Sequence, residues 1–180
     1  MLLYIHGFRT TPRSQTSQLL KKHYGEQLLL SDHPVTPDAA IGYMENLLKS
    51  YPVTGLIASS LGGFYATYLA HQYNLPAVLI NPSTQPFITT RAYLGTNITY
   101  DGETFEWQEH HLKELEKYAI ENPHPERYYL CLQKGDTVLD YRVALEYFDG
   151  AKVCLEEGGG HHFERLERHF ESIDSFLLPA

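Results

Sequence analysis

The chain has 180 residues, 43% of them hydrophobic and 13% aromatic, which is enough apolar surface for one core and predicts a single domain over residues 1–180. Its formal net charge of −8 at pH 7 argues against a nucleic-acid-binding protein. No run of 18 apolar residues occurs, and Met1 leads straight into an apolar run without a charged leader, so we expect a cytoplasmic protein with no membrane span.

Short apolar runs alternate along the chain with stretches whose apolar residues recur at helical spacing. The predicted strands cover residues 1–6, 27–31, 53–59, 77–80, 127–133 and 152–156. The predicted helices cover about residues 14–24, 36–50, 64–71, 107–120, 141–148 and 164–177. Thr36-Pro37-Asp38 is a strong start signal, because it combines an N-cap residue, a proline at the first helical position and an acid in the first turn.

This alternation predicts a mostly parallel six-stranded sheet with right-handed crossovers and helices on both faces. The favoured strand order is 2-1-3-4-5-6, which reverses between strands 1 and 3. A ligand crevice is expected at the carboxyl ends of these two strands, which carry His6-Gly7-Phe8 and Ser60.

Residues 83–107 interrupt the alternation with threonine, proline, glycine, asparagine and aromatic residues that show no periodicity. A segment of this length and composition predicts an inserted lid or cap. Its aromatic side chains are candidates for an apolar acyl pocket, although packing of the insert onto the body explains them equally well. The aromatic residues in question are Phe87, Tyr93, Tyr100, Phe105 and Trp107.

Ser60 lies between a predicted strand and a predicted helix, with Ala58 and Gly62 two residues away on either side. Small residues at these positions are typical of a nucleophile elbow, a sharp turn that lifts a serine hydroxyl clear of the sheet. The sequence here is A-x-S-x-G, with alanine in place of the usual first glycine. An ordinary strand-to-helix turn with Ser59 or Ser60 as N-cap is the alternative interpretation.

A serine nucleophile needs a base and an acid that orients the base. Asp136 follows the fifth predicted strand, and Asp140 is the reserve acid, although it has the position of a helix N-cap. His161 follows a glycine-rich loop after the last strand and is our candidate base, with His162 as the alternative. The chain order Ser, Asp, His is typical of α/β-hydrolases.

A tetrahedral oxyanion needs two N–H donors beside the nucleophile. We expect them to be the backbone amides of Leu61, directly after the nucleophile, and of Phe8, on the loop after the first strand. Together with the acid and the base, these residues predict a serine hydrolase.

Five segments, in order, resemble the YqiA-type esterases, a family of small bacterial α/β-hydrolases. They are Y-I-H-G-F with T-P-R-S, S-S-L-G-G-F-Y-A-T, L-P-A-V-L-I-N-P, G-D-T-V-L-D-Y-R and E-G-G-G-H-H-F. The resemblance covers nearly the whole chain and implies a three-layer α/β-hydrolase fold with Ser60, Asp136 and His161 as triad. The chain departs from the family pattern at Ala58, at Arg9, where asparagine is common, and at Gly160, where Asp or Asn is usual.

The substrate class stays open between an ester and a thioester, and no cofactor or metal is expected. Residues 1–25 contain four basic residues and no acid, and Arg9 and Arg13 lie on the loop beside the expected oxyanion hole. They either attract an anionic part of the substrate or form an ordinary solvated face. The sequence does not indicate the oligomeric state.

Two rival functions remain. The first is a metal hydrolase built from histidines and an aspartate, although their spacing does not match a known ligand pattern. The residues in question are His6, Asp32, His33, His161 and His162. The second is a non-catalytic binding protein on a hydrolase scaffold, because a fold alone does not determine function.

Overall fold

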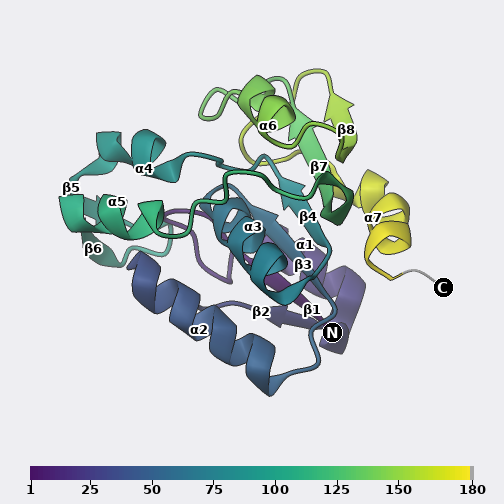
Figure 1. Ribbon diagram of the computed structural model, residues 1–180, viewed down its shortest axis with the longest axis horizontal. Coiled ribbons are helices and arrows are strands. Elements are labelled where there is room, and N and C mark those ends of the chain that lie inside the picture. Colours follow the sequence, from purple (N-terminus) through teal and green to yellow (C-terminus); the bar gives the residue numbers. More distant parts are fainter. Residues whose placement is uncertain (179–180) are drawn as a thin grey trace.

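The computed structural model describes residues 1–178, which form a central sheet between two layers of helices (Figure 1). The six strands of this sheet are β1 (Leu2–Ile5), β2 (Leu28–Leu30), β3 (Gly55–Ser59), β4 (Ala77–Ile80), β7 (Tyr128–Gln133) and β8 (Lys152–Glu156). They pair in the order β2-β1-β3-β4-β7-β8, and every pairing is parallel. Counted without β5 and β6, which the sequence did not predict, this is the expected order 2-1-3-4-5-6.

Alternate residues of each strand point to opposite faces, so the strands supply two separate apolar clusters. One cluster packs against α2 (Pro37–Ser50), α3 (Leu61–Tyr73), α5 (Glu109–Glu116) and α6 (Tyr141–Tyr147). The other packs against α1 (Gln15–Tyr24) and α7 (Phe170–Leu177). The predicted three-layer α/β arrangement is therefore confirmed, with helices on both faces of a buried parallel sheet.

Several helix ends follow from local chemistry. The side chain of Ser14 accepts a hydrogen bond from the backbone amide of Ser17 and caps α1, and Gly25, with φ of 55°, ends that helix. The predicted closing helix begins later than expected, because Arg165 adopts a left-handed conformation with φ of 57°. A 3-10 turn (Leu166–His169) follows it and leads into α7.

The segment between β4 and α5 contains a short helix α4 (Pro86–Thr89), a 3-10 turn (Thr90–Tyr93) and an antiparallel hairpin. The hairpin strands are β5 (Gly95–Ile98) and β6 (Thr104–Trp107), which lie at one end of the molecule, beside α5 (Figure 1). The prediction that Trp107 begins a helix is wrong. Trp107 ends β6 opposite Gly95, and α5 begins only after Gln108, which forms a capping box with His111.

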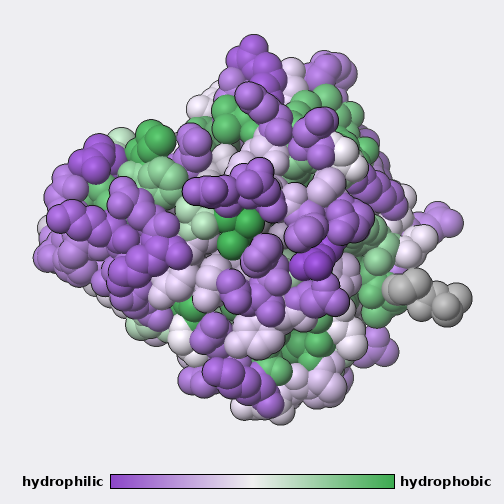
Figure 2. Space-filling model, in the orientation of Figure 1, coloured by the Kyte–Doolittle hydropathy of each residue, from purple (hydrophilic) through white to green (hydrophobic). Residues whose placement is uncertain are grey.

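Hydrophilic side chains cover most of the face drawn in Figure 2, and apolar side chains form small separate patches there. Within residues 1–178, no helix combines the length and the apolar composition that a membrane crossing needs.

Candidate active site

Ser60 occupies a strained turn between β3 and α3. Its φ of 52° and ψ of −125° are unusual for a residue that is not glycine, and such strain persists only where the surrounding structure imposes it. Although Ser60 stands at the N-cap position of α3, its side chain does not cap the helix. The interpretation as an ordinary N-cap serine is therefore not supported by the geometry.

Two glycines allow the elements around Ser60 to approach closely. A Cβ atom at Gly62 would lie 2.3 Å from the carbonyl oxygen of Ile5, so only glycine lets the start of α3 rest against the end of β1. A Cβ atom at Gly7 would lie 2.8 Å from the Cβ atom of Ser60. The loop after β1 therefore lies directly against the serine, as the reversal of strand order between β1 and β3 predicted.

Three side chains form one hydrogen-bonded chain at the carboxyl edge of the sheet. Nε2 of His161 lies 3.0 Å from Oγ of Ser60, and Nδ1 of His161 lies 2.8 Å from Oδ2 of Asp136. Because an ionised carboxylate only accepts hydrogen bonds, Nδ1 carries the proton, and Nε2 of the neutral ring accepts the serine hydroxyl. The structure thus brings together Ser60, His161 and Asp136, which three different strand ends supply.

Asp136 is held as a buried carboxylate, with a side chain only 2% exposed. Its other oxygen, Oδ1, accepts hydrogen bonds from the backbone amides of Val138 and Leu139, at 2.8 and 2.9 Å. Burial by itself would raise the pKa of Asp136, but the hydrogen bonds from His161, Leu139 and Val138 outweigh it and lower the pKa below the ordinary value. The carboxylate is therefore charged at neutral pH and able to orient the imidazole.

The alternative acid and base lie elsewhere. Asp140 caps α6 through the backbone amide of Arg142 and forms an ion pair with the same residue. His162 packs edge-on against Tyr100, with ring centroids 5.9 Å apart. Between the two adjacent histidines, the structure selects His161 as the partner of the serine.

Leu61 and Phe8, whose backbone amides were expected to form the oxyanion hole, both line a cavity that Ser60 also lines. Within residues 1–178, neither amide donates a hydrogen bond to another backbone group. Free N–H groups beside a nucleophile are what a developing oxyanion requires. The phenyl ring of Phe8 anchors its loop by packing edge-on against Trp107, with centroids 4.9 Å apart.

This cavity has a volume of about 350 Å³, and two of the four predicted substrate-binding residues line it. Arg9 and Tyr93 line its wall. Phe87 packs against the main core, and Trp107 is fully buried in it, so the structure places these two side chains in the body of the protein and not on the wall.

The tip of the β5–β6 hairpin lies beside the candidate site. Tyr100 lines the cavity beside Ser60 and also a second cleft of about 990 Å³, which α1 and the segment after His161 complete. Its backbone amide donates a hydrogen bond to the carbonyl of Arg9, at 3.0 Å. The next residue, Asp101, pairs with Arg13 at 2.6 Å and accepts a hydrogen bond from Thr11. The sequence analysis did not identify Asp101, because no local sequence pattern indicates its contact with Arg13, 88 positions away.

The residues of the metal-site alternative do not converge. His6 stacks on His33 with centroids 4.0 Å apart, and burial lowers the pKa of both rings. His161 contacts Ser60 and Asp136 instead. In the part of the chain that the structure describes, residues 1–178, no three His, Cys, Asp or Glu side chains form a metal-binding group.

The parallel sheet with this strand order, the strand–serine–helix turn and the two helical layers define the α/β-hydrolase fold. The chain belongs to the family described as Uncharacterised protein family (UPF0227), which is the YqiA family; the family model matches residues 1–178.

Solved structures share this fold at low sequence identity. The chain is similar to Est1E from Butyrivibrio proteoclasticus, with a TM-score of 0.76, 14% identity and coverage of 98% of this chain and 86% of the other. It is also similar to alpha/beta hydrolase domain-containing protein 10 from mouse, with a TM-score of 0.74, 14% identity and coverage of 97% of this chain and 88% of the other. The esterase domain of a Rhodothermus marinus protein matches with a TM-score of 0.67, 15% identity and coverage of 97% of this chain and 85% of the other.

Proposed function

We propose that this protein is a serine hydrolase that cleaves acyl esters or thioesters through an acyl-enzyme. The observation that carries the proposal is the hydrogen-bonded chain from Ser60 through His161 to the buried carboxylate of Asp136. The strained backbone of Ser60 supports it, because strain of this kind clusters at functional sites. The names of two of the structural neighbours, which are esterases, agree with it.

In the acylation half of the reaction, Nε2 of His161 removes the proton from Oγ of Ser60 as the oxygen attacks the substrate carbonyl. The carbonyl electron pair moves to oxygen, where the amides of Leu61 and Phe8 stabilise the negative charge. The imidazolium, held by Asp136, then gives its proton to the leaving alcohol or thiol. The acyl group remains as an ester on the serine.

Deacylation repeats these steps with water as the nucleophile. His161 takes a proton from the water, the resulting oxyanion occupies the same two amides, and the proton returns to Ser60 Oγ as the carboxylic acid leaves. Since a protonated imidazole cannot act as base, the mechanism predicts lower activity at acid pH.

The segment that spans residues 83–107 is proposed to act as a lid that selects the acyl group. Exposed apolar side chains lie on this segment and on the loop after Asp136. They are Ile88, Tyr93, Leu94, Ile98, Tyr100 and Val138. Of these, Tyr93, Tyr100 and Val138 line the cavity of about 350 Å³, whose size suits an acyl chain of modest length.

A strongly anionic substrate is less favoured by the charges around the site. Arg13 forms an ion pair with Asp101, so its charge is already compensated. Arg9 donates a hydrogen bond from Nε to the carbonyl of Ile98 and lies over the ring of Tyr100. The kcat/KM values for an anionic thioester and a neutral ester should therefore respond similarly to added salt; a much steeper fall for the thioester would show that these arginines attract anions.

The decisive experiment is labelling with a fluorophosphonate probe, which reacts with activated serines. The wild-type protein should be labelled and should hydrolyse short p-nitrophenyl esters, and Ser60→Ala should abolish both. Absence of labelling and of hydrolysis in a folded wild-type protein would contradict the proposal and favour a binding protein. Hydrolysis that survives in Ser60→Ala but disappears with a chelator would favour a metal hydrolase.

A further inference from the structure

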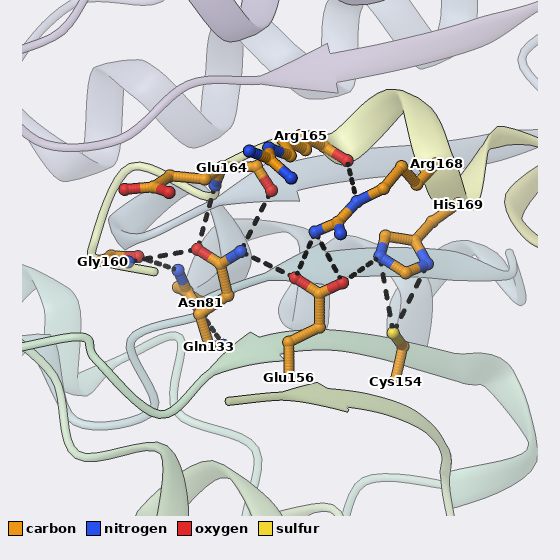
Figure 3. Close-up of polar contacts among 9 residues, drawn as sticks. All are labelled: Asn81, Gln133, Cys154, Glu156, Gly160, Glu164, Arg165, Arg168 and His169. Carbon is orange, nitrogen blue, oxygen red and sulfur yellow. Dashed lines mark hydrogen bonds and ion pairs between the residues drawn. The ribbon is translucent and has the colours of Figure 1, made fainter. Parts of the chain in front are cut away.

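Side chains from the carboxyl ends of three neighbouring strands meet beside the loop that carries His161, and two of them bind its backbone (Figure 3). Asn81 directly follows β4, Gln133 is the last residue of β7, and Glu156 is the last residue of β8. Because parallel strands end at one edge of the sheet, these three side chains meet beside the histidine loop.

Gln133 is at the centre of this group and is 2% exposed. Its Oε1 accepts hydrogen bonds from the backbone amides of Gly160, at 3.1 Å, and Glu164, at 2.9 Å. Its Nε2 donates to the carbonyl of Glu164, at 3.0 Å, and to Oε2 of Glu156, at 2.8 Å. Both hydrogens and both lone pairs of the amide are used, so one side chain holds the loop on both sides of His161.

Asn81 holds the same loop from the other direction. Its Nδ2 donates to the carbonyls of Gly160, at 2.9 Å, and of His161 itself, at 3.1 Å. Its Oδ1 accepts from the backbone amide of Gln133, at 3.0 Å, which ties the two amide side chains together. The backbone of Asn81 has φ of 41°, a conformation that asparagine tolerates better than most residues.

Glu156 determines which way the amide of Gln133 faces. Its carboxylate can only accept a hydrogen bond, so it fixes the NH₂ group of Gln133 on its side and leaves Oε1 for the loop amides. Arg168 and His169 bind the same carboxylate, with shortest contacts of 2.9 and 2.8 Å. The hydrogen bond from Gln133 is the main cause that lowers the pKa of Glu156.

Glycine makes the contact with Gln133 feasible. A Cβ atom at Gly159 would lie 2.1 Å from Oε1 of Gln133, and Gly159 has φ of +70°. A glycine-rich loop can give flexibility to the residue that follows it. The contacts indicate a different purpose for Gly159: it lets the loop lie flat against a buried amide.

We propose that Gln133, assisted by Asn81 and oriented by Glu156, is a positioning residue that sets the distance between His161 and Ser60. This inference rests on the proposed function, because it concerns the base of that reaction. The imidazole has one hydrogen bond to each triad partner, and a shift of about 1 Å at such a base lowers the rate by up to about 100-fold.

The first test replaces Gln133 by methionine, which keeps the length of the side chain and removes all four hydrogen bonds. For a short p-nitrophenyl ester, kcat should fall roughly 10- to 100-fold, and KM should stay within about twofold, because no substrate contact is lost. The rate of fluorophosphonate labelling should fall in parallel. Gln72→Met is the matched control, since Gln72 is exposed near the end of α3, and its kinetics should equal those of the wild type.

A double-mutant cycle separates positioning from a general loss of structure. In a His161→Ala background no base remains to be positioned, so Gln133→Met should not lower the residual rate further. An equal fractional loss with and without His161 would overturn the inference, as would a Gln133→Met enzyme with the kcat of the wild type.

A second pair of variants decides the matter if Gln133→Met does not fold. Glu156→Gln keeps an acceptor for the amide of Gln133 and should retain kcat within about twofold, whereas Glu156→Ala removes it and should lower kcat severalfold with KM unchanged. Equal kcat in the two folded variants would contradict the inference. A wild-type protein that is neither labelled nor active would contradict the proposed function, which is a different outcome.

Discussion

The Oγ atom of Ser60 lies 3.0 Å from Nε2 of His161, although 101 positions separate the two residues in the chain. The contact exists because β3 and the segment after β8 both end at the carboxyl edge of one parallel sheet. The positive φ of Ser60 then turns the hydroxyl toward the histidine loop.

The backbone strain at Ser60 should be measurable as a difference in the free energy of unfolding between two variants. Ser60→Gly and Ser60→Ala both remove the hydroxyl, but only glycine adopts a φ of 52° without a Cβ penalty. We expect Ser60→Gly to be more stable than Ser60→Ala by about 1 kcal/mol in urea unfolding, with both proteins inactive. Equal stability, or a more stable alanine variant, would show that the turn is not strained.

Asp136 should contribute stability that disappears at acid pH. Its pKa is lower in the folded protein than in the unfolded chain, so the folded state binds fewer protons near pH 4, and lowering the pH through this range favours unfolding. The stabilisation is present above about pH 4, the ordinary value for aspartate, and is lost as the pH falls through the lower folded value.

The measurement is the free energy of unfolding in urea at pH 6 and at pH 3. Asp136→Asn should lose less stability between these two pH values than the wild type does, because it has no carboxylate at this position to protonate. The control is Asp149→Asn, since Asp149 is exposed on a turn, and it should behave as the wild type. A wild-type loss no larger than that of Asp136→Asn would contradict the assignment.

Two glycine-to-alanine changes should have opposite effects on stability. At Gly62 the new methyl group would lie 2.3 Å from a backbone oxygen of β1, which cannot move without displacing the strand, so a loss of about 2 kcal/mol or more is expected. At Gly42, inside α2, nothing lies within 4 Å of the new methyl group, and alanine should add about 1 kcal/mol of helix stability. Thermal unfolding of the two variants checks both signs, and a neutral Gly62→Ala would disprove the close approach of α3 to β1.

The pair between Asp101 and Arg13 should hold the hairpin tip over the substrate cavity. Asp101→Asn weakens this pair, so Tyr100 is less well fixed, and KM for an ester should rise by up to about fivefold with kcat nearly unchanged, as expected for a largely exposed ion pair. KM of the wild type should also rise with salt, and KM of the variant should respond less. An identical salt response in the two proteins would show that the pair does not hold the tip.

The fold was predictable because its signals are local. The apolar runs Ala77–Ile80 and Lys152–Glu156 are observed as strands with the predicted bounds, and Thr36-Pro37-Asp38 marks the start of α2. A central parallel strand such as Ala77–Ile80 is short, buried and wholly apolar, so it can be identified without its neighbours. The edge strand Lys152–Glu156 is more exposed, but three consecutive apolar residues at its centre still identify it. The hairpin of β5 and β6 was missed for the opposite reason, because its residues are mostly exposed and show no alternation.

The candidate site was predictable only in part. Chain order and strand ends were enough to propose Ser60, Asp136 and His161, but the choice between two adjacent histidines depends on backbone direction, which neighbouring strands determine. In the structure it is His161 that faces the serine. The predicted pocket residues were only partly right for a related reason. The hydropathy of Trp107 does not reveal whether its side chain faces the cavity or the core.

The sequence by itself determined the class of fold and the kinds of side chain available at the carboxyl edge of the sheet, because helical and strand periodicity are properties of consecutive residues. Only the tertiary structure decided which of those side chains meet. Gln133 and Asn81 show this most clearly, since nothing near them in the chain indicates that their amides bind a loop 27 and 79 positions away. Such contacts arise from strand order and register, which the whole sheet decides together.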